Sequence, residues 1–500
     1  MKGVSEPMLL GIDVGTSAVK VGLFTADGET AALAWRAYPV HAPRPGWAEQ
    51  MPDDWWTAAC GAIHEVLAAA ETEQVAAVGL CGQTPGHVLV DASGRAVGPA
   101  IIWQDRRAEA EAAWLGKNVT AQQAREWVGL DSLADSTLPP ARMLWLANHR
   151  PRDWARCAVV LQPKDYISLR LTGECATDIH SAFGLASGDA EAYIPAFFDL
   201  LGLDIGRLPL LQSPTAVLGE VTETASEETG LPVGTPVVVG TVDAWAEIIG
   251  CGGTEPGRAV DIAGTSEVVA LVVDNFGRED GITGSRLFGN LGWLGGPTQA
   301  GGAALHWFAD GFYDEAEGVL ARLEADAASV QPGSDGLLFL PYLAGERAPI
   351  WDSAARGAFV GLTFGHTRAH CARAVYEGVA FSMRHILSLA ERASGVTANA
   401  LRVSGGGSRS ALWNQIKADV TKKQVLRMDV PEAGALGAAM LASIGVGLYR
   451  DHRAAAAAMV RAHVAAEPNR ERSLLYESSF VRYQSLYATL KDWFSGQSSE

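Results

Sequence analysis

Short apolar runs that end in glycine and hydroxyl residues set the pattern at the start of this chain. Residues 9–14 form one such run, which carries a single acid, Asp13, and ends in Gly-Thr-Ser at positions 15–17. A second apolar run follows at 19–24, and a third covers 31–38. Strand-length runs separated by turn residues predict a β-hairpin that is extended by a third antiparallel strand.

The same design returns near the middle of the chain. Residues 260–271 again contain an apolar run with one acid, Asp261, a Gly-Thr-Ser turn at 264–266 and a second apolar run. A repeat that lies about half a chain away indicates the duplication of one domain. For either copy alone, a plain hairpin with a structural aspartate remains the alternative.

Both turns have the chemistry of a phosphate site. Their glycines let the backbone approach a ligand closely, while the hydroxyls and N–H groups can bind phosphate oxygens. Asp13, at the end of its strand, is suited to hold a hydrated Mg²⁺ that bridges those phosphates. Two such turns facing each other would hold a nucleotide from both sides.

Helix and strand patterns alternate through the rest of the chain. Apolar residues at 56, 60, 63 and 67 predict one face of a helix that starts near Asp53, a suitable N-cap. Further helices are predicted over 108–150, with a break at Pro139 and Pro140, and over 369–392. Strands are predicted at 75–81, 159–161, 236–240 and 401–404. Turns at the carboxyl ends of such strands are where ligands bind in α/β folds, which directs attention to residues 82–86.

Asp243 follows the predicted strand 236–240 and begins a predicted helix. The positive end of the helix dipole and the free N–H groups keep a carboxylate at this position ionised. An ionised carboxylate in a cleft can accept a proton from an alcohol. An ordinary N-cap aspartate is the alternative interpretation.

Two glycine-rich segments lie in the second half of the chain. One, at 301–302, opens a predicted helix, and the other, at 405–407, follows the predicted strand 401–404. Such loops let an adenine or a phosphate lie against bare backbone, although plain turns have the same composition.

Composition narrows the classes of function. The chain of 500 residues is too long for a single core, so two domains are expected, at 1–248 and 249–500. Its net charge of −18 argues against nucleic acid or an anionic membrane as the main partner. The six cysteines are far apart, and no signal peptide or membrane-spanning run is found, which predicts a cytoplasmic protein with reduced thiols.

Taken together, the motifs resemble those of the FGGY carbohydrate kinases, in the superfamily of actin, hexokinase and the heat-shock chaperones, and most of all its xylulokinase-type members. The similarity runs through almost the whole chain. The matching segments are GIDVGTS (11–17), WQDRR (103–107), PKDY (163–166), LTGE (171–174), FLPYLAGER (339–347), GLT (361–363), EGVA (377–380), SGGG (404–407) and GALGA (434–438).

The resemblance implies two ribonuclease-H-like α/β domains with a cleft between them, an N-terminal one for the sugar and a C-terminal one for the nucleotide. It implies ATP-dependent phosphorylation of a sugar or polyol, with Mg²⁺. By position, Asp243 matches the catalytic base, and Asp13 and Asp243 are expected near the metal ion. The residues expected to bind the nucleotide are Thr16, Ser17, Lys20, Gly264, Thr265, Gly302, Gly406 and Ser410. Those expected to bind the acceptor are Gln83, Thr84, Trp103, Thr137 and Asp243.

The chain departs from the pattern of the family that it resembles at two positions expected to contact the acceptor. After the glutamine that matches Gln83, xylulokinases have Met-His and glycerol kinases have Arg-Glu, whereas this chain has Thr84 and Pro85. The residue after the matched base is often Asn or Gln, and here it is Ala244. The resemblance makes a xylulose-like ketopentose the main expectation, and these departures keep a hexulose, a tetritol, a deoxysugar or glycerol as alternatives.

A third hypothesis is a sugar-responsive ATPase or sensor that does not phosphorylate its ligand. The presence of Asp243 argues against it, because a sensor does not need a base. A homodimer is retained as one oligomeric state to test.

Overall fold

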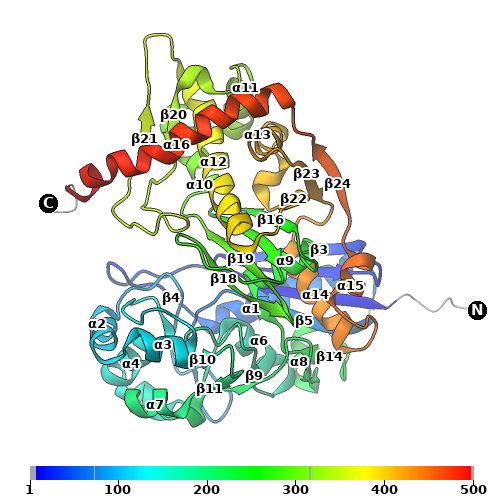
Figure 1. Ribbon diagram of the computed structural model, residues 1–500. Helices are drawn as coiled ribbons and strands as arrows, with labels where there is room; N and C mark the ends of the chain where they lie inside the picture. Colours follow the sequence, from blue (N-terminus) through cyan, green and yellow to red (C-terminus); the bar gives the residue numbers. More distant parts are fainter. Residues whose placement is uncertain (1–6, 73, 315–316, 497–500) are drawn as a thin grey trace, which may run out of the picture. The chain divides into compact units, whose positions relative to one another are not determined.

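The computed structural model describes residues 7–72, 74–314 and 317–496, which form two compact units (Figure 1). The first unit contains the described residues up to Gly250 together with Gly434–Met459. The second contains Cys251–Ala433 and the described residues from Val460 onward. The units therefore differ from the expected segments 1–248 and 249–500, because residues 434–459 pack with the first unit. Each helix in the described part of the chain is too short or too polar to span a membrane.

The first unit is built on a mixed sheet of seven strands in the order β13-β14-β5-β1-β2-β3, with β15 also pairing with β5. Strands β1 and β2 form the predicted hairpin, β3 adds the predicted third antiparallel strand, and β5 runs parallel to β1. The bounds are β1 Met8–Val14, β2 Ala18–Phe24, β3 Thr30–Ala37, β5 Val75–Gly82, β13 Val217–Glu220, β14 Pro236–Val238 and β15 Thr241–Val242.

Helix α1 (Pro52–Ala69) covers one face of this sheet and packs against β2 and β3. Its N-cap is Met51, so the prediction that Asp53 caps this helix is wrong. Pro52 takes the first helical position, where its missing N–H is not needed, and the helix therefore starts before Asp53. The Asp53 carboxylate instead accepts a hydrogen bond of 2.7 Å from the hydroxyl of Tyr166.

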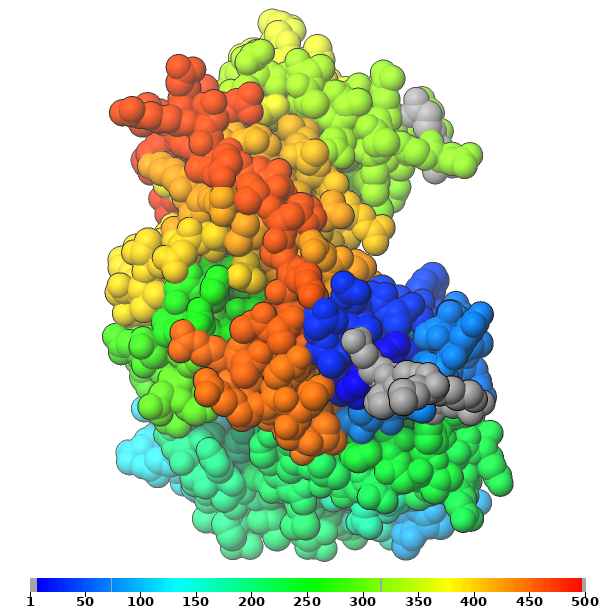
Figure 2. Space-filling model, turned by 90° about the vertical axis from the view of Figure 1, so that its right-hand side faces the viewer, coloured from blue at the N-terminus to red at the C-terminus, as the bar shows by residue number. Residues whose placement is uncertain are grey.

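The other face of the sheet is covered by α9 (Asp243–Gly250) and α14 (Ala433–Gly445). A Cβ at Gly11 in β1 or at Gly79 in β5 would lie within 2 Å of a carbonyl oxygen of α14. The strand glycines thus let the helix backbone lie directly on the sheet. The segment that continues into α15 (His452–Met459) lies beside the N-terminal strands, orange against blue in Figure 2.

The rest of the first unit is mainly helical; α6 and α8 pack against α1, and most of the other helices enclose a separate apolar core. The prolines expected to break the helical region start α4 instead, where both occupy first-turn positions. The helices are α2 Glu109–Asn118, α3 Ala121–Val128, α4 Pro139–His149, α5 Pro151–Arg156, α6 Pro163–Thr172, α7 Pro195–Leu201 and α8 Glu223–Thr229. Short strand pairs connect them: β4 Glu49–Gln50 with β7 Ala100–Ile101, β6 Val88–Val90 with β8 Val159–Leu161, β9 Ala176–Thr177 with β12 Leu210–Leu211, and β10 Ala186–Ser187 with β11 Ala192–Tyr193.

The second unit contains another mixed sheet of seven strands, in the order β18-β19-β17-β16-β22-β23-β24. Here β16 and β17 form a hairpin, and β22 runs parallel to β16, as β5 does to β1. The two sheets thus share the arrangement that the repeated sequence pattern predicts. The bounds are β16 Arg258–Ala263, β17 Glu267–Val273, β18 Thr283–Phe288, β19 Leu291–Pro297, β22 Ala400–Ser404, β23 Gln424–Met428 and β24 Ala462–Ala466.

Helix α12 is the central helix of the second unit and packs against β17, β19, α11 and α13. The C-terminal helix α16, red in Figure 1, lies across α13 and the short strand β20. The bounds are α10 Gly302–Phe312, α11 Val319–Ala328, α12 Arg368–Ser394, α13 Ala411–Thr421, α16 Arg470–Gly496, β20 Leu338–Leu340 and β21 Ala358–Val360.

Candidate active site

Asp13 lies near the end of β1, just before the first Gly-Thr-Ser turn. The apolar residues on either side of it enter the core on the α1 side, so Asp13 faces α9 and α14, and it is only 4% exposed. Across the hairpin, Lys20 Nζ lies 3.8 Å from Asp13 Oδ2. A Cβ at Gly434, in the first turn of α14, would lie 3.1 Å from the same oxygen. The carboxylate is therefore held beside one cation and the positive end of a helix.

Asp243 is the first residue of α9 and follows β15 directly. Strand β15 and strand β1 both run parallel to β5, on opposite sides of it, so Asp13 and Asp243 come to the same edge of the sheet. The Asp243 carboxylate accepts a hydrogen bond of 2.7 Å from the N–H of Ala244. Burial and the charge of Asp13 raise the pKa of Asp243 to about 6, against the opposing effects of this N–H and of Lys20. A carboxylate with this pKa is a stronger base than an exposed aspartate.

A buried ion cluster supports the segment that leads into Asp243. Lys164 Nζ donates to Asp165 Oδ1 at 2.6 Å and to the Val239 carbonyl at 3.1 Å, and it lies 3.3 Å from Asp178 Oδ1. The Thr241 hydroxyl donates to Asp178 at 2.7 Å. Burial lowers the pKa of Lys164, but the two carboxylates outweigh it and the net shift is upward. The charged lysine thus fixes the end of β14 and the start of β15.

The first turn is joined to the acceptor side by two residues expected to bind the acceptor. Trp103 Nε1 donates a hydrogen bond of 2.9 Å to Thr16 Oγ1. Gln83 is 2% exposed, and its amide N–H donates to the Gly15 carbonyl at 3.1 Å and to Gln50 Oε1 at 2.8 Å. The donors of both side chains are therefore used within the protein, and the Gln83 amide acts on the turn itself.

Thr84 and Thr137, the other two residues expected to bind the acceptor substrate, differ in the hydrogen bonds that their hydroxyls make. The Thr84 hydroxyl is half-buried and is 3.5 Å from the Gly82 carbonyl, at the geometric limit of a hydrogen bond. Thr137 donates its hydroxyl and its backbone N–H to Asp135, each at 2.7 Å. Among the hydrogen bonds of the described residues, those of Thr137 go to Asp135 and not to Gln83 or Trp103.

Two residues that contact the first turn, Tyr38 and Gln50, were not predicted from the sequence as part of the site. The Tyr38 hydroxyl donates to the Gly15 carbonyl, and Gln50 Nε2 donates to the Thr16 carbonyl at 2.7 Å. Burial and the charges of Asp13 and Asp243 raise the pKa of Tyr38, so its phenol stays protonated as a donor. Tyr38 ends the strand predicted over 31–38, whereas no element was predicted at Gln50, and only the folded chain shows that both residues contact this turn. Ser17 is exposed beside them.

The second Gly-Thr-Ser turn is held by the start of α10. The N–H of Gly302 donates to the Gly264 carbonyl at 2.9 Å, and the N–H groups of Gly301 and Ala303 both donate to the Thr265 carbonyl at 3.0 Å. The structure thus brings three expected nucleotide residues together, namely Gly264, Thr265 and Gly302. A Cβ at Gly302 would lie 2.8 Å from the Gly264 carbonyl oxygen, so a side chain there would displace the turn.

The glycine-rich loop after β22 leaves open space at one position. A Cβ at Gly406 would meet no atom within 4 Å, whereas one at Gly405 would lie 2.7 Å from the Ala263 carbonyl oxygen. Ser410 has a structural role, because its hydroxyl caps α13 through the Trp413 N–H and donates to Glu324 at 2.8 Å. Gly406 is therefore the better candidate for contact with a base.

A buried ion cluster also lies beneath the second turn. Lys417 Nζ donates to Asp261 at 2.5 Å and to Glu267 at 2.6 Å, and it lies 4.2 Å from the centre of the Trp413 ring. Burial and the charge of Asp261 raise the pKa of Glu267 to about 8, against the effect of Lys417. The sequence pattern singled out Asp261 but gave no signal for its partners.

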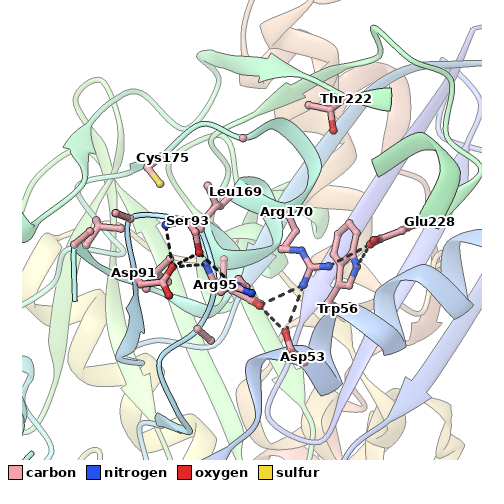
Figure 3. A pocket seen from close by; sticks show the side chains of 18 of the residues that line it. Asp53, Trp56, Asp91, Ser93, Arg95, Leu169, Arg170, Cys175, Thr222 and Glu228 are labelled. Atoms are coloured by element: carbon pink, nitrogen blue, oxygen red, sulfur yellow. Dashed lines mark hydrogen bonds and ion pairs between the residues drawn. The ribbon is translucent and has the colours of Figure 1, made fainter. Parts of the chain in front are cut away.

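A cavity of about 1020 Å³ lies elsewhere on the first unit, and none of the expected site residues lines it. Figure 3 shows Arg170 between Asp53 and Glu228, at 3.4 and 3.2 Å, with Trp56 also donating to Glu228. Arg170, Asp53 and Glu228 are therefore paired with one another in this cavity.

Asp13 and Asp243 are the residues expected near a magnesium ion. The described residues contain no group of three or more histidine, cysteine, aspartate or glutamate side chains that could hold a metal ion. Mg²⁺ keeps most of its waters and binds through one or two carboxylates and substrate phosphates, so a site for this ion does not require such a group. Asp13 and Asp243 supply such carboxylates at one edge of the sheet.

Comparisons with known proteins agree with this arrangement. Residues 8–250 match the N-terminal domain of the FGGY family of carbohydrate kinases, and residues 260–446 match its C-terminal domain. The chain is 30% identical to the xylulose kinase of Bacillus subtilis, with 97% of each chain covered. It superposes on the xylulose kinase of Rhodospirillum rubrum with a TM-score of 0.87 and 30% identity, covering 98% of this chain and 100% of that one. It superposes on the gluconate kinase of Lactobacillus acidophilus with a TM-score of 0.87 and 26% identity, covering 97% of this chain and 98% of that one.

Proposed function

Since this chain belongs to the FGGY family of carbohydrate kinases, we propose that it transfers the γ-phosphate of ATP to a hydroxyl of a xylulose-like ketopentose. The observation that carries the proposal is the placement of Asp243, whose carboxylate starts a helix at the same edge of the sheet as Asp13 and has a pKa of about 6.

In this proposal the first unit binds the acceptor and supplies the base. Asp243 accepts the hydroxyl proton while the acceptor oxygen attacks the γ-phosphorus, and the bond from that phosphorus to the bridging oxygen of ADP breaks. General-base assistance of this kind contributes about 10²–10⁴ in rate. Positioning and charge neutralisation supply most of the rest.

Most of the residues expected to bind the nucleotide lie in or beside the two repeated turns. Thr16, Ser17 and Lys20 offer hydroxyls, N–H groups and a cation to phosphate oxygens. Gly264, Thr265 and Gly302 let the nucleotide lie close to the backbone of the second turn. Gly406 provides the open space for the base. When bound, Mg²⁺ would neutralise phosphate charge, and Asp13 and Asp243 would hold it, the former through water.

A different acceptor on the same machinery is the second candidate. Thr84, Pro85 and Ala244 offer few polar atoms where a multiply hydroxylated ligand needs donors and acceptors, and the donors of Gln83, Trp103 and Thr137 are already used. These observations favour an acceptor that makes few polar contacts there, such as a deoxysugar, over glycerol.

The test is ADP release, coupled to a spectroscopic readout, with a panel of ketopentoses, hexuloses, tetritols, deoxysugars, gluconate and glycerol. Release that depends on a ketopentose supports the proposal, and release that depends on another acceptor supports the second candidate. Release at the same rate without any acceptor would show an ATPase or sensor and would contradict both.

A further inference from the structure

We propose that Arg142 is a positioning residue for the acceptor site, which it acts on by holding the loop after β5 and the loop after β7 in one arrangement. This inference rests on the proposed function for the location of the acceptor. It depends on contacts within the first unit alone.

Arg142 lies on α4 and is completely buried. Its Nη1 donates to the Pro85 carbonyl at 3.1 Å, and its Nη2 donates to the Trp103 carbonyl at 2.6 Å and to the Asp105 carbonyl at 2.9 Å. One guanidinium therefore bonds three carbonyls on two loops that are separate in sequence. The first loop carries Thr84 and the second carries Trp103, both of which are expected to contact the acceptor.

We call the three hydrogen bonds from Arg142 to the carbonyls of Pro85, Trp103 and Asp105 the Arg142 clamp. Trp103 connects this clamp to the first Gly-Thr-Ser turn. The carbonyl of this residue is held by Arg142, while its indole N–H donates to Thr16 in the first Gly-Thr-Ser turn. A shift of the loop would therefore move the indole relative to Thr16. The position of α4 thus bears on both the acceptor side and the phosphate turn.

An arginine suits the three hydrogen bonds made by residue 142 better than a lysine does. Burial lowers the pKa of Arg142 to about 10, which leaves it charged at neutral pH, and Arg107 acts in the same direction while Asp105 and Asp135 oppose it. Burying a charge is unfavourable unless hydrogen bonds compensate, and three carbonyls do so here. A planar guanidinium can span two loops, whereas a lysine ammonium is a compact donor on a flexible chain.

Two substitutions at Arg142 distinguish its positioning of the two loops from a general contribution to the stability of the fold. Arg142→Met removes all three bonds, and Arg142→Lys keeps the charge and part of the bonding. Arg207→Met is the matched control, because Arg207 also donates to a backbone carbonyl of the first unit, that of Trp154, which lies on neither loop.

The kinetic measurement uses the acceptor that gives ADP release with the unaltered chain. Arg142→Met is expected to raise KM for that acceptor at least about tenfold and KM for ATP by a smaller factor, through Trp103 and Thr16, and Arg142→Lys is expected to recover part of the loss. A merely structural arginine would lower the unfolding temperature as Arg207→Met does while leaving both KM values unchanged, and that result would overturn the inference.

Amide hydrogen exchange tests the clamp without any acceptor. In the unaltered chain the amides of Gly86, His87, Asp105 and Arg106 are hydrogen-bonded. Arg142→Met, or Arg142→Lys if the former does not fold, is expected to speed exchange in peptides covering 84–87 and 103–107 but not in β16 and β17. Unchanged exchange in both loops overturns the inference even if no acceptor is found, whereas absence of acceptor-dependent ADP release from the unaltered chain contradicts the proposed function alone.

Discussion

The indole N–H of Trp103 and the hydroxyl oxygen of Thr16 are joined by a hydrogen bond of 2.9 Å. One residue follows β7 and the other belongs to the turn between β1 and β2, so the bond links the acceptor side of the first unit to its phosphate turn. The direction of the bond is fixed, because an indole N–H can only donate. The Thr16 hydroxyl proton is thereby left free to bond a phosphate oxygen.

This bond predicts non-additive kinetics. Trp103→Phe keeps most of the ring but removes the donor, so Thr16 loses its orientation and kcat/KM for ATP is expected to fall about three- to tenfold. In a Thr16→Val background, the same change at 103 should have almost no further effect on kcat/KM for ATP. Additive losses in the four-variant cycle would show that the bond does not orient Thr16.

Replacement of Asp243 by asparagine tests the base. The amide keeps the size of the side chain but cannot accept a proton, so kcat is expected to fall at least about 10²-fold. Nucleotide affinity, measured by calorimetry, should stay within about threefold because the binding turns are unchanged. Turnover close to that of the unaltered chain would rule out the assignment of Asp243.

Alanine substitutions at Gly406 and Gly302, two of the glycines expected to contact the nucleotide, test the nucleotide site. A methyl group at Gly406 meets nothing in the protein, so Gly406→Ala is expected to leave the unfolding temperature unchanged and to raise the Kd for ATP only if the base lies against this loop. Gly302→Ala, by contrast, should weaken ATP binding by displacing the Gly264 carbonyl, which lies 2.8 Å from the added carbon. Calorimetric titration with ATP compares the two, and unchanged affinity in both variants would refute the proposed nucleotide site.

Glu267 predicts how stability depends on pH. Its pKa is about 8 in the folded chain, mainly because it is buried, and is about 4.3 for an unperturbed glutamate. The folded state therefore binds more protons than the unfolded state in this interval, and the stabilisation is full below about pH 4 and is lost as the pH rises through 8. The unfolding temperature of the unaltered chain should fall between pH 6 and pH 9 more steeply than that of Glu267→Gln.

Calorimetric scans at several pH values provide this measurement, with the exposed Glu471→Gln as the control. The control is expected to follow the unaltered chain. Equal slopes for all three proteins would show that Glu267 does not hold a proton in the folded state.

Local sequence patterns predicted one hairpin in each sheet, several of the central strands and the helices α1 and α12. The strands β18, β19, β23 and β24 were not predicted. Alternating apolar residues and Gly-Thr-Ser turns predicted β1 with β2 and β16 with β17, because strand pairing across a short turn depends on neighbouring residues. The helix over 369–392 was predicted almost to its ends, at Arg368 and Ser394. The family was also indicated by motifs along the chain, and the comparisons confirm it.

Tertiary structure alone decided which side chains act together. Residues 434–459 return to the first unit because α14 lies on Gly11 and Gly79, a contact that no local pattern contains. The sequence did not show that the Ser410 hydroxyl caps α13 or that the Thr137 hydroxyl donates to Asp135. Arg142 drew no attention in the sequence, since its partners are backbone carbonyls and a carbonyl has no sequence signature. The sequence by itself therefore determined the elements, their repeat and the identity of the acids, whereas burial and long-range hydrogen bonds, which exist only after the chain is packed, determined the site.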